Sequence, residues 1–216
     1  MALNGMVLSN LNAYDSMTQT SISRVEILKR QFVEQFDYDA GTCQLSGVQG
    51  TCTLAHILPV HARKISSVMQ LLQMTESMLN SPGNLLLLAS NIERAFDALK
   101  VSFVARLGEG LRTEFVLKIW DESVRSEPIF SGSAVTIGDC EHRPLMFNAE
   151  HHVYSRCFAY QGLWAAAKYL GGDLRDASDY FRVDSLDEPH QALFMQILAA
   201  KRAALSLTIE RETEDG

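Results

Sequence analysis

The chain has 216 residues, 47% of them hydrophobic, and a formal net charge of −7. This length and composition allow a real hydrophobic core and predict one domain with a helical annex. The sequence contains no uninterrupted apolar run of about 18 residues, which argues against a membrane span. The net negative charge argues against electrostatic binding of nucleic acid over a broad surface. Residues 1–21 lack a basic start and a compact apolar block, so we expect no signal peptide and an intracellular protein.

The first half of the chain alternates helical and extended patterns. Apolar residues recur at helical spacing over 23–39, which predicts a helix. Two short β-prone runs around Gly47 and Gly50 predict a β-hairpin within 43–57. A short amphipathic helix is expected over 66–80 and is broken by the sequence NSPG.

The later segments continue the mixture of strands and helices. The run 84–100 begins extended and becomes helical, and 101–107 and 113–120 are predicted strands. A loop over 131–144 precedes two expected helices, 148–170 and 188–207.

These patterns predict an α+β protein in four parts. Residues 1–22 form a flexible arm, and 23–120 form the core with its flanking elements. Residues 121–207 form a loop and C-terminal helices packed on the core, and 208–216 form a frayed tail. The core motif alone is too small for a stable domain, so we expect the C-terminal helices to cover its outer face and leave the site open.

The four cysteines are widely spaced and form no CxxC pair. This spacing argues against a zinc site built on cysteines and favours buried, reduced thiols. Cys43 and Cys52 could face each other across the predicted hairpin and would pair only in an oxidising compartment.

Four polar residues stand in an order that suits phosphodiester chemistry. His56 lies at the exit of an apolar strand, Asn84 precedes the next extended run, and Glu93 and Asp97 follow on a helix. Carboxylates four residues apart share a helix face and can bind one divalent cation. A histidine outside that ligand shell can deprotonate water, and an asparagine can hold its imidazole in the correct tautomer.

The sequences AHILP and NSPGNLLLLASNIERAFDALKVSF resemble the HNH nuclease family, in the branch with the pattern AHI-x-P, N-x-L-x-L and FD. Cys43, just ahead of Ser46-Gly47, matches the cysteine that often opens this branch, and the resemblance runs from about Cys43 to Phe103. It implies a ββα-metal core that cuts DNA with a single divalent ion.

Carried over residue by residue, the resemblance assigns the general base to His56 and the base-orienting residue to Asn84. It places the metal ligands at Glu93 and Asp97, with Mg²⁺ or Mn²⁺ preferred and Zn²⁺ or Ni²⁺ compatible. The expected partner is nucleic acid, DNA in preference to RNA, with no membrane. Many HNH nucleases carry a metal ligand immediately before the base, where this chain has Ala55.

Simpler interpretations of the same residues remain open. His56 could be a structural histidine, and Asp97 could accept hydrogen bonds that only support the fold. Ser90 and Glu93 fit a capping box, in which Glu93 would bond back to the helix start.

The basic residues His61, Arg63 and Lys64 follow the base, and Arg94 lies on the predicted helix; each is a candidate phosphate contact or a solvated cation. His151-His152 is predicted as a partly exposed helix end. The aromatic residues Phe158, Tyr160, Trp164 and Tyr169 are predicted as core packing rather than a base-stacking platform.

Three hypotheses for function follow. The first is a metal-dependent DNA endonuclease. The second is a catalytically inactive HNH fold used as a binding or regulatory module, which Ala55 and the acidic flanks favour. The third is an unrelated α/β protein in which the HILP sequence is structural.

Overall fold

The computed structural model of the protein describes residues 24–108, 112–148 and 150–169. The predicted arm (1–22), the helix over 188–207 and the tail (208–216) lie outside the described residues. The helices and strands are α2 (Arg24–Phe36), β1 (Cys52–His56), α3 (Ser66–Leu71), α4 (Glu76–Leu79), β2 (Leu85–Ala89), α5 (Ser90–Asp97), β3 (Val101–Leu107), β4 (Thr113–Ile119) and α6 (Ser155–Tyr169). Short 3₁₀ helices include η2 (Val60–Lys64) and η3 (Pro82–Asn84). Helices and two small antiparallel sheets agree with the predicted α+β class.

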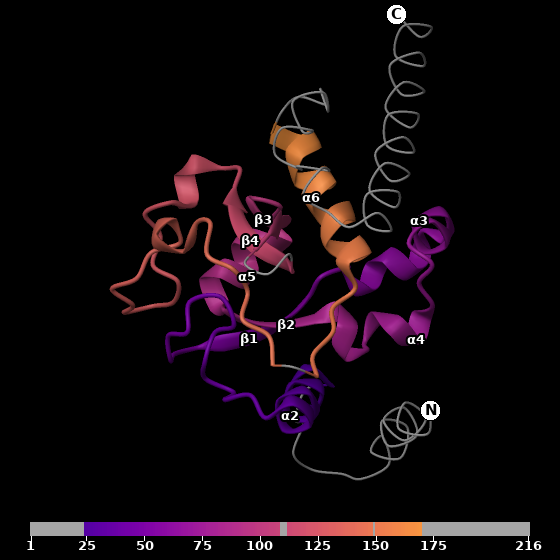
Figure 1. Cartoon of the computed structure of the whole chain (residues 1–216), viewed down its shortest axis with the longest axis horizontal. Helices are drawn as coiled ribbons and strands as arrows, with labels where there is room; N and C mark the ends of the chain where they lie inside the picture. Colours follow the sequence, from indigo (N-terminus) through magenta and orange to yellow (C-terminus); the bar gives the residue numbers. More distant parts are fainter. Residues whose placement is uncertain (1–23, 109–111, 149, 170–216) are drawn as a thin grey trace, which may run out of the picture.

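The first sheet pairs β1 with β2, and its register sets His56 opposite Leu85. All five residues of β2 are buried, so this strand is covered on both faces. The helix α5 begins directly after β2 and packs against both strands (Figure 1). Two antiparallel strands and a helix are therefore contiguous at the residues that carry the candidate chemistry.

The predicted local hairpin within 43–57 is wrong about the partner of β1. The segment before β1 closes a tight turn instead, with a single bridge between Thr42 and Gln49 and with Gly47 at a φ of +69°. The segment after Cys43 has only two large apolar residues, Leu45 and Val48, whereas β2 has four consecutive leucines. Pairing with β2 thus buries far more apolar area.

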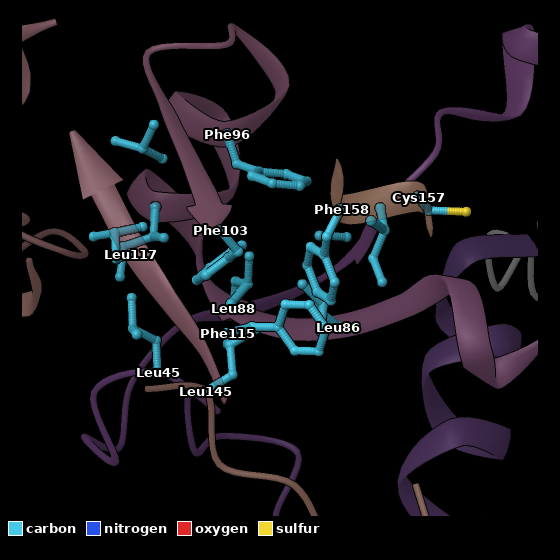
Figure 2. Packing of buried hydrophobic residues seen from close by; sticks show 14 of the residues in the cluster. Leu45, Leu86, Leu88, Phe96, Phe103, Phe115, Leu117, Leu145, Cys157 and Phe158 are labelled. Carbon is cyan, nitrogen blue, oxygen red and sulfur yellow. The ribbon is translucent and has the colours of Figure 1, made fainter. Parts of the chain in front are cut away.

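The second sheet is the β3–β4 hairpin, and α6 packs against β3. The predicted strands over 101–107 and 113–120 are confirmed. The core between these elements is aromatic, as Figure 2 shows: Phe103 lies between Phe96 and Phe158, and Phe115 stacks on Phe158 with ring centroids 4.4 Å apart. This packing fixes α6 relative to α5, although the two helices come from separate parts of the sequence.

The expected helix over 66–80 is divided into α3 and α4. The chain turns between them at Gln73, whose φ of +48° ends the first helix. The helix expected over 148–170 begins later, at Ser155. In the part of the chain that the structure describes, no helix is long and apolar enough to cross a bilayer.

His151 is buried, with only 3% of its surface exposed, which corrects the prediction of a partly exposed helix end. Its Nε2–H donates to the carbonyl of Pro82 at 3.0 Å, and its Nδ1 accepts from the hydroxyl of Tyr38 at 3.0 Å. Its ring contacts four aromatic side chains: Phe32, Phe36, Tyr38 and Phe147. His151 therefore ties the segment before α6 to the loop that leads into β2.

Candidate active site

His56 is the last residue of β1, and its imidazole is half-buried. Its Nε2 lies 3.0 Å from Oδ1 of Asn80, the residue that follows α4. Burial lowers the pKa of His56 below its usual value, and the hydrogen bond to Asn80 and the charge of Asp97 oppose that shift. The imidazole is therefore predominantly neutral near pH 7, which is the state a general base requires.

Asn84 is fully buried and does not contact the imidazole. Its Oδ1 accepts from the backbone N–H of Leu58 at 2.8 Å, and its Nδ2 donates to the carbonyls of Leu58 and Leu79 at 2.9 Å each. The backbone of Asn84 also accepts from the N–H of Ile57 at 2.9 Å. Asn84 thus holds the two backbone positions that follow His56, and it positions the imidazole through the main chain.

Glu93 and Asp97 lie four residues apart on α5, with Asp97 at its last turn. The pKa of Glu93 is raised, first by burial and then by the negative charge of Asp97. The pKa of Asp97 is also raised by burial, while His56 and His61 lower it; this side chain keeps contact with solvent, so the burial effect is modest. Neither carboxylate forms a hydrogen bond or ion pair within the described residues.

The capping-box interpretation of Glu93 does not fit the structure. The N-cap of α5 is Ala89, and no side chain caps the helix. The backbone N–H of Ser90, which the box would assign to Glu93, donates to the carbonyl of Thr51 at 3.0 Å. Glu93 is therefore not needed to satisfy the start of the helix.

The donor set suits a cation that needs few protein ligands. Within the described residues, no three His, Cys, Asp or Glu side chains gather closely enough to hold a metal by themselves. Two mutually repelling carboxylates on one helix face form a locus of negative charge that a cation would neutralise. Mg²⁺ commonly accepts one or two carboxylates and completes its shell with water and phosphate oxygens, so the residues fit such an ion.

His56 and Asp97 border one cavity of about 210 Å³. The residues after β1 form one side of it, and these include His61 on η2. Arg63 and Lys64 continue η2 and are exposed. Arg94 lines a different hollow, together with Lys100 and Pro128, and donates to Oδ1 of Asn91 at 2.7 Å. The lining of this cavity therefore includes His56, His61 and Asp97 but neither Asn84 nor Glu93, and Arg94 lies elsewhere.

The helix α6 forms another wall of the cavity, through Tyr160, Gln161 and Trp164. The sequence predicts that the C-terminal helices leave this site open, and the structure adds that α6 borders it. This position of α6 follows from the packing of Phe158 into the aromatic core, which draws α6 along β3. Trp164 is 42% exposed, so the prediction of core packing is wrong for this residue, whereas Phe158 and Tyr160 are buried.

Sequence reasoning missed Asn80 and Gln161. Asn80 belongs to the NSPG sequence, which predicts a helix break, and the family resemblance assigns the orienting role to Asn84 instead. Gln161 belongs to no recognisable sequence motif, and only the packing of α6 places it beside the cavity.

One comparison with known proteins found a match, to a family model. Residues 43–104 match the family model described as HNH endonuclease, which confirms the resemblance over the segment from Cys43 to the middle of β3. The chain therefore carries an HNH-type segment, from a family whose members are generally nucleases. Neither the curated proteins nor the solved structures contain a match.

Proposed function

We propose that the protein is a metal-dependent endonuclease that hydrolyses phosphodiester bonds of DNA, with His56 as general base. The observation that supports the proposal is that His56 and Asp97 line one cavity, inside the segment that matches the HNH family. The partly exposed ring of His56 does not fit a histidine that only fills the core.

The hydrogen bond with Asn80 selects the tautomer of His56. Because Asn80 presents Oδ1, an acceptor, Nε2 of His56 carries the proton. Nδ1 is then the unprotonated nitrogen, and it can accept a proton from the attacking water. Asn84 keeps the strand end in place, so that the basic nitrogen stays at a fixed position relative to α5.

One divalent ion, Mg²⁺ or Mn²⁺ in preference to Zn²⁺ or Ni²⁺, would be held by Glu93 and Asp97, with water and substrate completing its shell. When bound, such an ion stabilises negative charge on the phosphate and on the leaving oxygen. Glu93 and Asp97 contribute charge and position, and His56 contributes proton transfer.

His61, Arg63 and Lys64 supply candidate contacts for the flanking phosphates, because η2 follows the base directly. Arg94 lies at the other hollow and would contact the backbone further from the scissile bond. Such phosphate contacts fix the register of a nucleic acid without reading its sequence.

The alternative proposal is a catalytically inactive HNH-type binding or regulatory module. Ala55 favours it, because this residue stands where many relatives carry a ligand and is only 1% exposed. Fewer ligands mean weaker ion binding, and a binding module needs none.

A plasmid-nicking assay with Mg²⁺ or Mn²⁺ tests the proposal. Nicking should require the ion, stop with chelator and be lost in His56→Ala, while the exposed His152→Ala serves as the matched histidine control and retains it. A folded wild-type protein that binds DNA without nicking it under any of these ions would instead support the inactive module.

A further inference from the structure

The cavity beside His56 differs from a purely phosphate-binding cleft because most of its lining is apolar. Ile57, Pro59 and Val68 contribute from one side, and Phe96 and Leu99 contribute from α5 and the residues after it. Its polar side chains are His56, His61 and Asp97 at the candidate active site, and Gln161 on α6. A ligand that fills this space therefore needs apolar faces.

Gln161 supplies a specific polar feature in that apolar wall. The residue is 5% exposed, and its Nε2 donates to the carbonyls of Phe96 at 3.2 Å and Val101 at 3.4 Å. Both hydrogens of the amide are thereby used, which fixes the orientation of the side chain. Oε1 is left buried without a hydrogen-bond partner within the described residues.

A buried acceptor without a partner costs about 1–3 kcal/mol, and native proteins rarely leave one without reason. A flip of the amide would not relieve it, because Oε1 would then face the two carbonyls that Nε2 now satisfies. Because Gln161 lines the cavity, we infer that a ligand N–H entering it is the partner that Oε1 lacks.

Trp164 adds an aromatic surface one turn further along α6. The residue is 42% exposed, and its ring lies 5.9 Å from the ring of Tyr160, centroid to centroid. An exposed indole at the edge of an apolar cavity can stack on a flat ligand ring.

We propose that this cavity holds one unpaired nucleobase next to the scissile phosphate, with Trp164 stacking on the base and Oε1 of Gln161 accepting one of its N–H groups. The inference rests on the proposed nuclease function and adds the substrate class: single-stranded DNA, or a duplex with an unpaired nucleotide at the cut. Each of the four bases combines apolar faces with an N–H donor on the edge that pairing would otherwise occupy.

The charge of the protein supports this assignment. A net charge of −7 provides few phosphate contacts, so stacking has to supply affinity that other nucleases obtain from basic surfaces. Stacking of a base on an aromatic side chain contributes about 1–3 kcal/mol. A paired base cannot enter the cavity unless it first leaves the helix, which favours substrates that are already unpaired.

The test measures binding of the full chain to short fluorescent oligonucleotides by anisotropy, in chelator so that metal-dependent cleavage is suppressed. Three probes share one sequence: a single strand, the same strand with an abasic position, and the duplex. We expect the intact single strand to bind more tightly than the other two. Trp164→Ala should weaken its binding by about tenfold and remove the difference between intact and abasic strands.

Two further variants make the result specific. Gln161→Met removes the acceptor at similar length and should also weaken binding of the intact strand; thermal melting checks that α6 remains folded. Met146→Ala removes another exposed apolar side chain, outside the cavity, and should leave binding unchanged. In a Trp120→Phe background, the fluorescence of Trp164 should be quenched by the intact strand more than by the abasic one.

Equal binding of intact and abasic strands, or an unaffected Trp164→Ala, overturns the nucleobase site. If the same protein still nicks plasmid, the nuclease proposal stands without it. A chain that neither binds nor cuts any of these probes overturns both proposals together.

Discussion

Oδ1 of Asn80 lies 3.0 Å from Nε2 of His56, so Asn80 is the side chain that orients the candidate base. Asn84, which the family resemblance assigns to that task, directs all its side-chain hydrogen bonds to backbone groups. The two asparagines therefore divide the positioning of His56: one acts on the ring and the other on the strand end.

Asn80→Ala should change the titration of His56 while leaving the fold intact. The hydrogen bond raises the pKa of His56 against the effect of burial, so its loss lowers that pKa further. The acid limb of the cleavage rate should move to lower pH, and the plateau should fall about 10- to 100-fold because the ring loses its orientation. NMR titration of the imidazole and a rate profile from pH 5 to 8 check this. An unchanged or raised pKa would contradict the assignment of Asn80.

Asn84→Ala should act on stability. The change leaves the N–H of Leu58 and the carbonyls of Leu58 and Leu79 without partners in a buried loop, at a cost of about 3 kcal/mol or more. Denaturant unfolding measures this loss. Asn80→Ala is the matched control. Asn80 is exposed, so this variant should lower the free energy of unfolding by less than about 1 kcal/mol. Similar losses of unfolding free energy in the two variants would show that the hydrogen bonds of Asn84 do not hold this loop in place.

The sequence predicts local elements well where one pattern dominates. The leucines of β2 and the amphipathic pattern of α5 can both be recognised in residues 85–97, and α5 carries the two carboxylates four residues apart. The pairing of β1 is not visible, because its partner lies about thirty residues later and the nearer glycines favour a local turn. The approach of α6 depends on how Phe158 packs, and no motif encodes that contact.

Glu93→Gln should stabilise the ion-free protein while weakening its response to divalent ions. The pKa of Glu93 is raised in the folded state, so the protonated carboxyl favours folding. This contribution is fully present at a pH below the pKa of the unfolded chain, and it is lost as the pH rises through the folded-state pKa. At pH 7 the charged carboxylate therefore costs stability, and the amide should recover about 0.5 kcal/mol after allowance for solvent screening. Melting temperatures in chelator, between pH 4 and 8, measure the gain.

The same variant separates an ion ligand from an unrelated acid. Mg²⁺ or Mn²⁺ should raise the melting temperature of the wild type more than that of Glu93→Gln. Glu76→Gln, an exposed change on α4, should match the wild type in both respects. Equal responses of all three proteins to the ion would remove Glu93 from the proposed ligand set.

His151 should make the protein sensitive to mild acid. Burial lowers the pKa of His151 in the folded state. The neutral ring therefore favours folding at a pH above the pKa of the unfolded chain, near 6.5, and this contribution is lost as the pH falls through the folded-state pKa. Protonation would place a second N–H against the hydroxyl of Tyr38 and charge a ring enclosed by aromatic side chains. His151→Gln should be less stable at pH 7 by about 1–3 kcal/mol. Its unfolding free energy should change less between pH 7 and 5 than that of the wild type, and equal slopes would contradict this role.

Ala55→Asp tests whether the position before the base can become a metal ligand. Ala55 pairs with Leu86 and is 1% exposed, and successive residues of a strand point to opposite faces, so its side chain points away from the face that His56 presents. An aspartate there places an unpaired carboxylate in the core, which should destabilise the protein by about 3 kcal/mol or more. Ala55→Asn has nearly the same volume without the charge, so the difference between the two variants in denaturant unfolding isolates the cost of the charge.

Isothermal titration with Mn²⁺ should show no tighter binding in Ala55→Asp than in the wild type. A variant that instead remained stable, bound the ion more tightly and cut DNA faster would show that the side chain at this position reaches the ion, and the nuclease would then be a weakened relative of a three-ligand enzyme.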